Sequence, residues 1–323
     1  MSRRPQVSQL AALAIAASAA MPATASDYPE QEIELIIPYG PGGATDIIFR
    51  LIADEAEQYL GQAIVPVNMA GAGATRGSRH VLAADPDGYT LLGSHDTIAL
   101  SNLAGMVDYS YMDFAPIALL TQTINIPSTY PDHPIQSADD IADYVEENSG
   151  EVRFSMIPTS TDHFFWAQFF GAAGIDMADI GFVSYDDTGE QVSALMAGDI
   201  DFAMLNLPSG GSYFEDGSLV PLAVAHPERL DGLPDAPTLR EVGIELDNAT
   251  SRGLFAPPGT PDEVIEALAD AFGRALENEE LQARIENEFG TIVNFLAGQD
   301  YLDFLEENEA NLAEAAKNIN FDG

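Results

Sequence analysis

The stretch Pro38–Asp46, "PYGPGGATD", decides how the N-terminal part of the chain folds. The apolar run "IELII" (Ile33–Ile37) precedes it and "IIFRLIADEAEQYL" (Ile47–Leu60) follows it, which predicts a strand, a sharp turn and a helix. Because Gly42 and Gly43 carry no side chain, backbone N–H groups there can approach an anion closely, and a helix N-terminus favours negative charge. The stretch is therefore either an anion-binding turn or a tight turn without a ligand.

Two further loops follow the next two predicted strands. They are "NMAGAGATRG" (Asn68–Gly77) and "GSHDT" (Gly93–Thr97). Since the carboxyl ends of parallel strands meet at one edge of a sheet, three such loops favour a binding site there. "GPGGATD" lacks the Lys and Ser/Thr of a P-loop, and "GAGATRG" is one residue away from the dinucleotide fingerprint. Nucleotide binding is therefore disfavoured.

Short apolar runs alternate with helical patterns along the rest of the chain. Val152–Ile157 and Ile180–Tyr185 read as strands, for example, and the apolar stretch His163–Gly174 between them reads as a helix. Alternation of this kind predicts an α/β fold with largely parallel sheets. A chain of 323 residues is long enough for two such domains.

The composition is strongly acidic. Fifty-two Asp and Glu residues face 12 Lys and Arg residues, which gives a formal net charge of −40. This charge repels nucleic acid and anionic membrane surfaces, so neither is expected as a partner. The acids are spread along the chain without a calcium-loop pattern, and we interpret them as a solvated surface suited to high external salt.

The first 25 residues read as a cleaved export signal. Arg3 and Arg4 precede the apolar run Leu10–Met21, and the small residues Ala23–Ala25 supply a cleavage site. We therefore expect residues 1–25 to be a signal peptide and the mature protein to be exported. The chain has no cysteine, so disulfides are excluded.

The sequence carries none of the common catalytic motifs: no H-E-x-x-H, no G-x-S-x-G and no cysteine nucleophile. Its five histidines lack metal-ligand spacing; they are His80, His95, His133, His163 and His226. His95 and His163 lie where they could reach a cleft, although a structural role is equally open for each. We expect no enzyme activity, no metal and no cofactor.

The order of motifs along the chain resembles the Bug-type substrate-binding proteins of tripartite tricarboxylate transporters. The resemblance rests on "PYGPGGATD" and "GAGATRG", on "DPDGYTLL" (Asp85–Leu92), on "ALMAGDIDFAMLNLPS" (Ala194–Ser209) and on "GLFAPPGTPDEV" (Gly253–Val264). It extends from Tyr28 to near the C-terminus. No single element is specific, but this set in this order is.

The resemblance implies a periplasmic solute receptor with the two-domain, type II periplasmic-binding-protein fold and a hinged cleft. Residues 26–124 and 250–323 would form domain 1, and residues 125–249 domain 2. The receptor would bind a small carboxylate, act as a monomer, and deliver its ligand to a membrane permease of one large and one small subunit. A receptor for an ATP-driven importer or a sensor kinase is the alternative, and a secreted enzyme on the same fold is a weaker one.

The resemblance also implies ligand-binding positions, at which backbone N–H groups and hydroxyls hold the carboxylate. These are Tyr39, Gly42, Gly43, Ala44, Thr45, Asp46, Ala72, Gly73, Ala74, Ser94, Thr97, Thr159, Ser160, Thr161, His163, Tyr185, Thr188, Gly189 and Asn206.

The chain departs from the family pattern at two places near the expected cleft. Arg252 stands where an apolar or aromatic residue is common, so it either binds a ligand carboxylate or pairs with a surface acid. Where the family often reads "PYKGSGPA", this chain has "SYDDTGEQ", which puts Asp186, Asp187 and Glu190 near the cleft. They either belong to the acidic surface or select a cationic group on the ligand.

Overall fold

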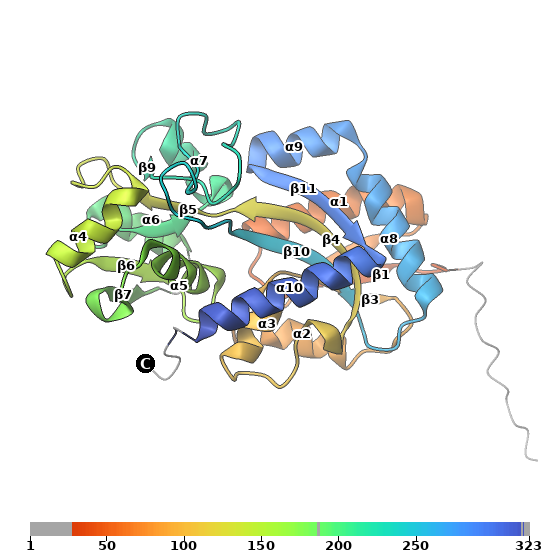
Figure 1. Ribbon diagram of the computed structural model, residues 1–323. Helices are drawn as coiled ribbons and strands as arrows, with labels where there is room; N and C mark the ends of the chain where they lie inside the picture. Colours follow the sequence, from red (N-terminus) through yellow and green to blue (C-terminus); the bar gives the residue numbers. More distant parts are fainter. Residues whose placement is uncertain (1–27, 186–187, 318, 320–323) are drawn as a thin grey trace, which may run out of the picture.

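The computed structural model describes residues 28–185, 188–317 and 319. The predicted signal peptide and the predictions on Asp186 and Asp187 lie outside the described residues. Figure 1 shows two lobes, each with its own sheet. Within the described residues no helix is long and apolar enough to cross a membrane.

The larger lobe is built from both ends of the chain. Its elements are β1 (Ile33–Ile37), α1 (Ala44–Leu60), β2 (Ile64–Asn68), α2 (Thr75–Leu82), β3 (Thr90–Ser94), α3 (Thr97–Leu103), η2 (Tyr111–Asp113), β4 (Ala115–Ile124), β10 (Ala249–Ala256), α8 (Asp262–Leu276), α9 (Glu279–Phe289), β11 (Thr291–Ala297) and α10 (Gly298–Ala316). Six strands form one sheet in the order β11-β4-β10-β3-β1-β2.

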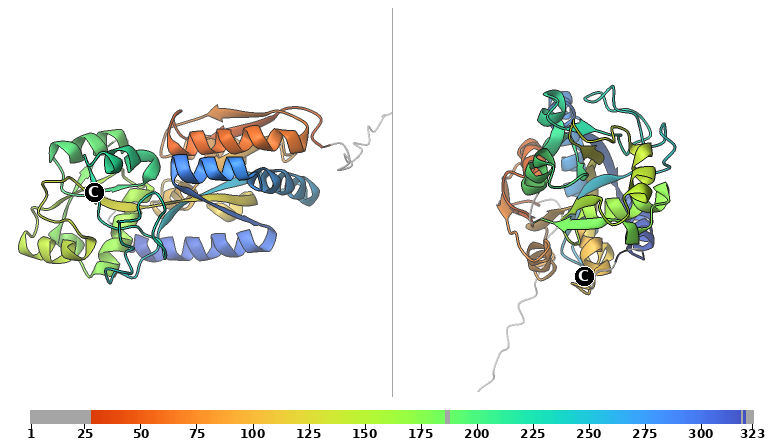
Figure 2. Two further views of the ribbon diagram at one scale, coloured as in Figure 1. Left: turned by 90° about the horizontal axis from the view of Figure 1, so that it is seen from above. Right: turned by 90° about the vertical axis from the view of Figure 1, so that its left-hand side faces the viewer.

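Helices cover both faces of this sheet. Ile48, Phe49 and Ile52 of α1 pack with Leu268 and Phe272 of α8 in one buried apolar cluster. On the other face, α2, α3 and α10 share a second cluster, and Figure 2 shows α10 on the opposite side of the sheet from α1. Burial of apolar side chains on both faces fixes the edge of the sheet from which the binding loops project.

The smaller lobe contains η3 (Ala138–Asp140), η4 (Met177–Asp179) and the following elements: β5 (Ile126–Thr129), α4 (Ile141–Glu147), β6 (Arg153–Met156), α5 (Thr161–Ala173), β7 (Gly181–Ser184), α6 (Thr188–Ala197), β8 (Ala203–Leu205), α7 (Leu207–Glu215) and β9 (Val220–Pro221). The three-stranded sheet β8-β5-β9 and the pair β6-β7 meet at the Phe154–Phe202 bridge. An aromatic core stabilises this lobe: the Phe154 ring lies 4.8 Å from Trp166 and 5.1 Å from Phe202.

The expectation of largely parallel sheets is wrong in part. Strands β1, β2 and β3 are parallel, but β10 runs antiparallel to β3 and β4, and β11 antiparallel to β4. The sheet β8-β5-β9 is antiparallel throughout. The physical reason is that β4 leads out of the larger lobe, so the strand that returns beside it must run the opposite way.

Two neighbouring strands connect the lobes. Strand β4 continues through Asn125 into β5, and the chain returns through Asn248 into β10. The two crossing points are hydrogen-bonded: Asn125 N donates to Asn248 O at 3.2 Å, and Asn125 Nδ2 donates to Asn248 Oδ1 at 2.5 Å. The lobes are therefore joined at a narrow, hydrogen-bonded pair of strands.

Candidate ligand-binding cavity

A cavity of about 500 Å³ lies between the two lobes, and we call it the front cavity. The larger lobe contributes the turn after β1, the loop after β3, and residues of β10 and α9. The smaller lobe contributes the first residues of α5, α6 and α7. Most of the lining residues are thus positioned by a strand end or a helix end, whereas Val192 and Tyr213 reach the cavity from within α6 and α7.

The turn "PYGPGGATD" forms one wall. Gly42 takes the left-handed conformation at φ +82°, and Gly43 is the N-cap of α1 with no side chain capping the helix. The Asp46 carboxylate holds the turn, because it accepts hydrogen bonds from Gly42 N at 2.9 Å, Asn68 Nδ2 at 2.8 Å and Arg50 Nε at 2.8 Å. Burial raises the Asp46 pKa, but these hydrogen bonds outweigh burial and hold the pKa below its ordinary value. The N–H groups of Ala44 and Thr45, at the start of α1, have no acceptor among the described residues and are available to a ligand.

Tyr39 and His95 form the floor beside this turn. Their rings stack at 4.4 Å with an interplanar angle of 6°. The Tyr39 hydroxyl is hydrogen-bonded to Ser94 Oγ at 3.0 Å and to Thr97 Oγ1, and burial raises its pKa to about 12. Burial, together with the nearby Arg252 charge, lowers the His95 pKa well below 6.5, so both rings are neutral at pH 7. His95 Nδ1 is buried and has no partner among the described residues.

Arg252 of β10 is the cationic group of the front cavity and is 3% exposed. Its Nε donates to Thr45 Oγ1 at 3.0 Å, and its Nη1 donates to Thr123 Oγ1 and, at 3.5 Å, to Thr250 O. Burial lowers its pKa to about 10, which still leaves it charged at neutral pH. Among the residues that the structure describes, no carboxylate lies within 4 Å of the guanidinium.

The smaller lobe presents three helix N-termini to the cavity. Ser160 is the N-cap of α5, and Thr188 and Gly189 begin α6. Asn206 caps α7 in a capping box, in which Ser209 N donates to Asn206 Oδ1 at 3.1 Å. Together with α1, four helices therefore direct their positive ends towards one cavity.

Most of the sequence-predicted residues line this cavity. They are Tyr39, Gly42, Gly43, Ala44, Thr45, Asp46, Thr97, Ser160, Thr161, Thr188, Gly189, Asn206 and Arg252.

The other predicted residues lie outside the lining. Ser94 is buried behind the Tyr39 hydroxyl. The loop Ala72–Ala74 lies against Met106 instead, where a Cβ on Gly73 would come within 3.1 Å of the Met106 methyl group. Thr159 hydrogen-bonds the same Met106 sulfur at 3.6 Å.

His163 and Tyr185 are occupied by contacts within the smaller lobe. Thr159 N donates to His163 Nδ1 at 3.4 Å, and the His163 ring packs on Phe182 at 5.3 Å. Tyr185 packs against a buried apolar cluster of the smaller lobe. Neither side chain is among those that line the front cavity.

Sequence reasoning left the role of His95 open and missed several other lining residues: Ile47, Val192, Pro208, Ser209, Tyr213, Thr250 and Phe289. Ser209 and Thr250 adjoin predicted positions and could have been found from them. Tyr213 and Phe289 reach the cavity from the body of α7 and the end of α9, for which the sequence offers no local signal.

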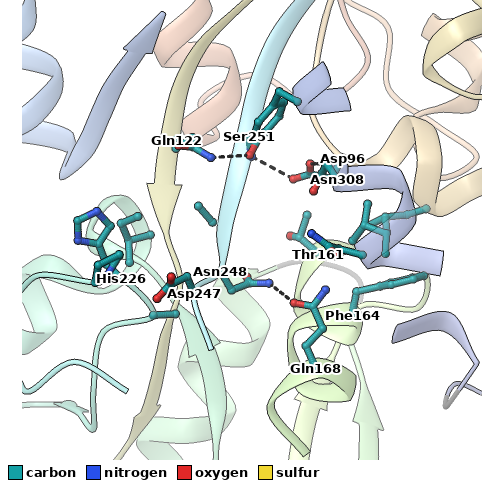
Figure 3. A pocket seen from close by; sticks show the side chains of 18 residues that line it. Asp96, Gln122, Thr161, Phe164, Gln168, His226, Asp247, Asn248, Ser251 and Asn308 are labelled. Atoms are coloured by element: carbon teal, nitrogen blue, oxygen red, sulfur yellow. Dashed lines mark hydrogen bonds between the residues drawn. The ribbon is translucent and has the colours of Figure 1, made fainter. Parts of the chain in front are cut away.

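A second cavity of about 360 Å³, the rear cavity, lies on the opposite face of β4 and β10 (Figure 3). Thr250 and Arg252 line the front, whereas Ser251 and Gln122 line the rear. Side chains alternate along a strand, so the two connecting strands separate the cavities.

Polar groups of the rear cavity bind one another (Figure 3). Gln122 Nε2 donates to Ser251 Oγ at 3.1 Å, and Ser251 N donates to Asp96 Oδ2 at 3.0 Å. Asn308 Nδ2 donates to Asp96 Oδ1 at 2.8 Å. Burial raises the Asp96 pKa, although these bonds oppose the rise. The rear cavity therefore has its main hydrogen bonds satisfied without a ligand, which makes the front cavity the better candidate.

The described residues contain no group of three or more potential metal ligands. The front cavity is instead lined by hydroxyls, backbone amides at helix ends and a single guanidinium. Such a donor set suits a small organic anion.

Comparison with known proteins agrees with this geometry. The model of the tripartite tricarboxylate transporter family receptor matches residues 48–321. Protein BugT of Bordetella pertussis is 28% identical over 271 residues, which cover 81% of this chain and 81% of BugT. MatC of Rhodopseudomonas palustris, solved with bound malate, has a TM-score of 0.77 at 27% identity over 90% of this chain and 100% of MatC.

A second R. palustris protein, solved with adipate, has a TM-score of 0.78 at 26% identity, over 90% of this chain and 98% of its own. The family match covers well over half of the sequence, and the solved structures share both lobes. The chain therefore belongs to the receptor family of the tripartite tricarboxylate transporters and has the two-domain α/β fold of periplasmic binding proteins.

Proposed function

We propose that this protein binds a small carboxylate in the front cavity and delivers it to a membrane permease of one large and one small subunit. One observation carries the proposal: the N-termini of α1, α5, α6 and α7, from both lobes, converge on a cavity that also holds a buried guanidinium. A helix N-terminus has the effect of about half a positive charge and offers free N–H donors. An anion is the ligand that such a site stabilises.

The two walls of the front cavity indicate how many anionic groups the ligand carries. The larger lobe offers the α1 end with Arg252, and the smaller lobe offers the α5, α6 and α7 ends, so two anionic groups can be held at once. The relatives solved with malate and with adipate support a ligand with two carboxylates. We therefore favour a dicarboxylate over a monocarboxylate.

Binding is coupled to closure of the lobes. Residues 26–124 with 250–323 and residues 125–249 are the two bodies that we propose, and the strand pair at Asn125 and Asn248 is the hinge. An anion that docks on the larger lobe satisfies the helix ends of the smaller lobe only when the lobes approach. The permease would recognise the closed form.

The cellular setting is part of the same proposal. Residues 1–25 would direct export to the periplasm, and the receptor would act there as a monomer. The acidic surface would keep it soluble in high salt.

A ligand screen tests the proposal. The mature protein in 2 M salt is titrated with malate, adipate, acetate and citrate, and with adipamide as the uncharged control, by thermal shift and calorimetry. We expect saturable binding and a higher melting temperature with a dicarboxylate, and neither with adipamide. If no carboxylate binds, or if adipamide binds equally well, the proposed function is wrong.

A further inference from the structure

We propose that Arg252 binds one carboxylate of the ligand, jointly with the N-terminus of α1, and thereby makes the receptor selective for a charged acid over its uncharged amide. The inference rests on the proposed function and deepens it. The resemblance implied only backbone amides and hydroxyls at this site, so a guanidinium would give this chain an ionic contact of its own.

Arg252 is a buried charge with no carboxylate within 4 Å among the described residues. Arg252 is 3% exposed, and its described hydrogen-bond acceptors are two threonine hydroxyls and a backbone carbonyl. These are neutral, and no hydrogen bond among the described residues uses Nη2. A buried ion is costly unless an opposite charge neutralises it, and here the cavity is the place from which that charge can come.

The position of the guanidinium also favours a ligand carboxylate. Arg252 Nε is hydrogen-bonded to the hydroxyl of Thr45, which is the second residue of α1. The cation therefore lies beside the positive end of a 17-residue helix whose N-cap residue, Gly43, provides no side-chain cap. The guanidinium and the positive end of α1 repel each other, and a carboxylate bound between them would be attracted to both.

Within the described part of the chain, no acid of this floor forms an ion pair with Arg252: Asp96, whose charge favours the charged form of Arg252, lies beyond 4 Å. His95 is neutral, and its ring is stacked on Tyr39, whose hydroxyl is also neutral. Asp46, the carboxylate among the cavity-lining residues, is occupied by Gly42, Asn68 and Arg50. Thr45 and Thr123 hold the guanidinium in place, so little side-chain freedom is lost when a ligand binds.

Calorimetry on Arg252→Gln tests the inference, with the dicarboxylate found in the screen and its monoamide as ligands. Arg274→Gln is the matched control, because Arg274 lies on the outer surface of α8 and its removal changes the net charge equally. We expect Arg252→Gln to weaken dicarboxylate binding about ten- to a hundredfold and to abolish the preference for acid over amide. Arg274→Gln should stay within about twofold of the wild type.

The melting temperature without ligand separates binding from a structural role. Because a buried charge that has no described carboxylate within 4 Å is removed, ligand-free Arg252→Gln should melt no lower than the wild type, while its ligand-induced shift shrinks. Arg252→Lys keeps the charge and should retain part of the preference for acid.

Three results would overturn the inference: unchanged affinity in Arg252→Gln, a lower ligand-free melting temperature, or failure of that variant to fold. In each case a wild type that binds the dicarboxylate leaves the proposed function standing. A wild type that binds no carboxylate removes the function itself.

Discussion

The two cavities on either side of the connecting strands differ in how their polar groups are satisfied. At the rear, Gln122, Ser251 and Asp96 bond to one another and to α10. At the front, Arg252 and the N-termini of four helices face a space of about 500 Å³. Strands β4 and β10 line both cavities, and the two cavities differ in whether their polar groups already have partners. Unsatisfied polar groups indicate a binding site better than cavity size does, because burying them is costly until a ligand binds.

The largest expected effect concerns the N-terminus of α1, which should bind a carboxylate of the ligand in the front cavity. Gly43→Asp would place a carboxylate at the N-cap, where aspartate is well tolerated. We expect the free energy of unfolding to change by less than about 0.5 kcal/mol, and dicarboxylate affinity to fall about a hundredfold, because the new carboxylate occupies and repels the anion site. Urea unfolding and calorimetry measure the two quantities.

The control for this variant is Asn311→Asp, which adds the same charge at the rear cavity on an exposed residue. It should leave affinity within about twofold. Equal losses in both variants would mean that net charge, and not the α1 end, governs binding.

The two aspartates next to the cavities should respond to pH with opposite sign. The pKa of Asp46 is lowered, so the stability it contributes is present above its unfolded pKa near 3.8 and is lost as the pH falls through the folded value. The pKa of Asp96 is raised, so the folded state favours its protonated form, and its contribution falls as the pH rises from 3.8 through the folded value.

Urea unfolding between pH 3 and 6 measures this contrast. Asp46→Asn should cost about 2 kcal/mol at pH 6, and that cost should shrink as the pH falls. Any cost of Asp96→Asn should instead be largest at low pH and shrink as the pH rises. Parallel pH profiles for the two variants would show that the environments of the two carboxylates do not differ in this way.

The smallest expected effect concerns association with the ligand. A net charge of −40 repels an incoming anion, whereas the attraction in the front cavity is local. Raising salt screens the long-range repulsion first, since the Debye length is about 10 Å at 0.1 M. Stopped-flow association of the dicarboxylate should therefore accelerate about two- to fivefold from 0.1 M to 2 M salt. A slower association at high salt would contradict this, because it would show that attraction by the front cavity outweighs the long-range repulsion of the ligand by the net charge.

Sequence patterns that span a few residues predicted the parts of the site that are formed by neighbouring residues in the chain. The strand, turn and helix around Pro38–Asp46 form as expected, because apolar periodicity and glycine placement act over a few residues. The direction of β10 was not predictable in this way, because it depends on β4 leaving the larger lobe. The loop Ala72–Ala74 ends at the correct edge of the sheet but lies against Met106, a contact set by tertiary packing.

The environment of Arg252 shows the same limit. Its neighbours Thr45 and Thr123 come from α1 and β4, 207 and 129 positions away in the sequence. The sequence marked Arg252 as unusual but left open whether a surface acid pairs with it. The packing of the strands shows that this guanidinium is buried, faces a cavity and has no described carboxylate within 4 Å.

A crystal structure of the mature protein grown with the bound dicarboxylate tests the binding proposal most directly. We expect the ligand in the front cavity, with one carboxylate within hydrogen-bond distance of Arg252 and the start of α1, and the other at the helix ends of the smaller lobe. A ligand in the rear cavity, or one in the front cavity whose carboxylates avoid both Arg252 and the α1 end, would contradict it.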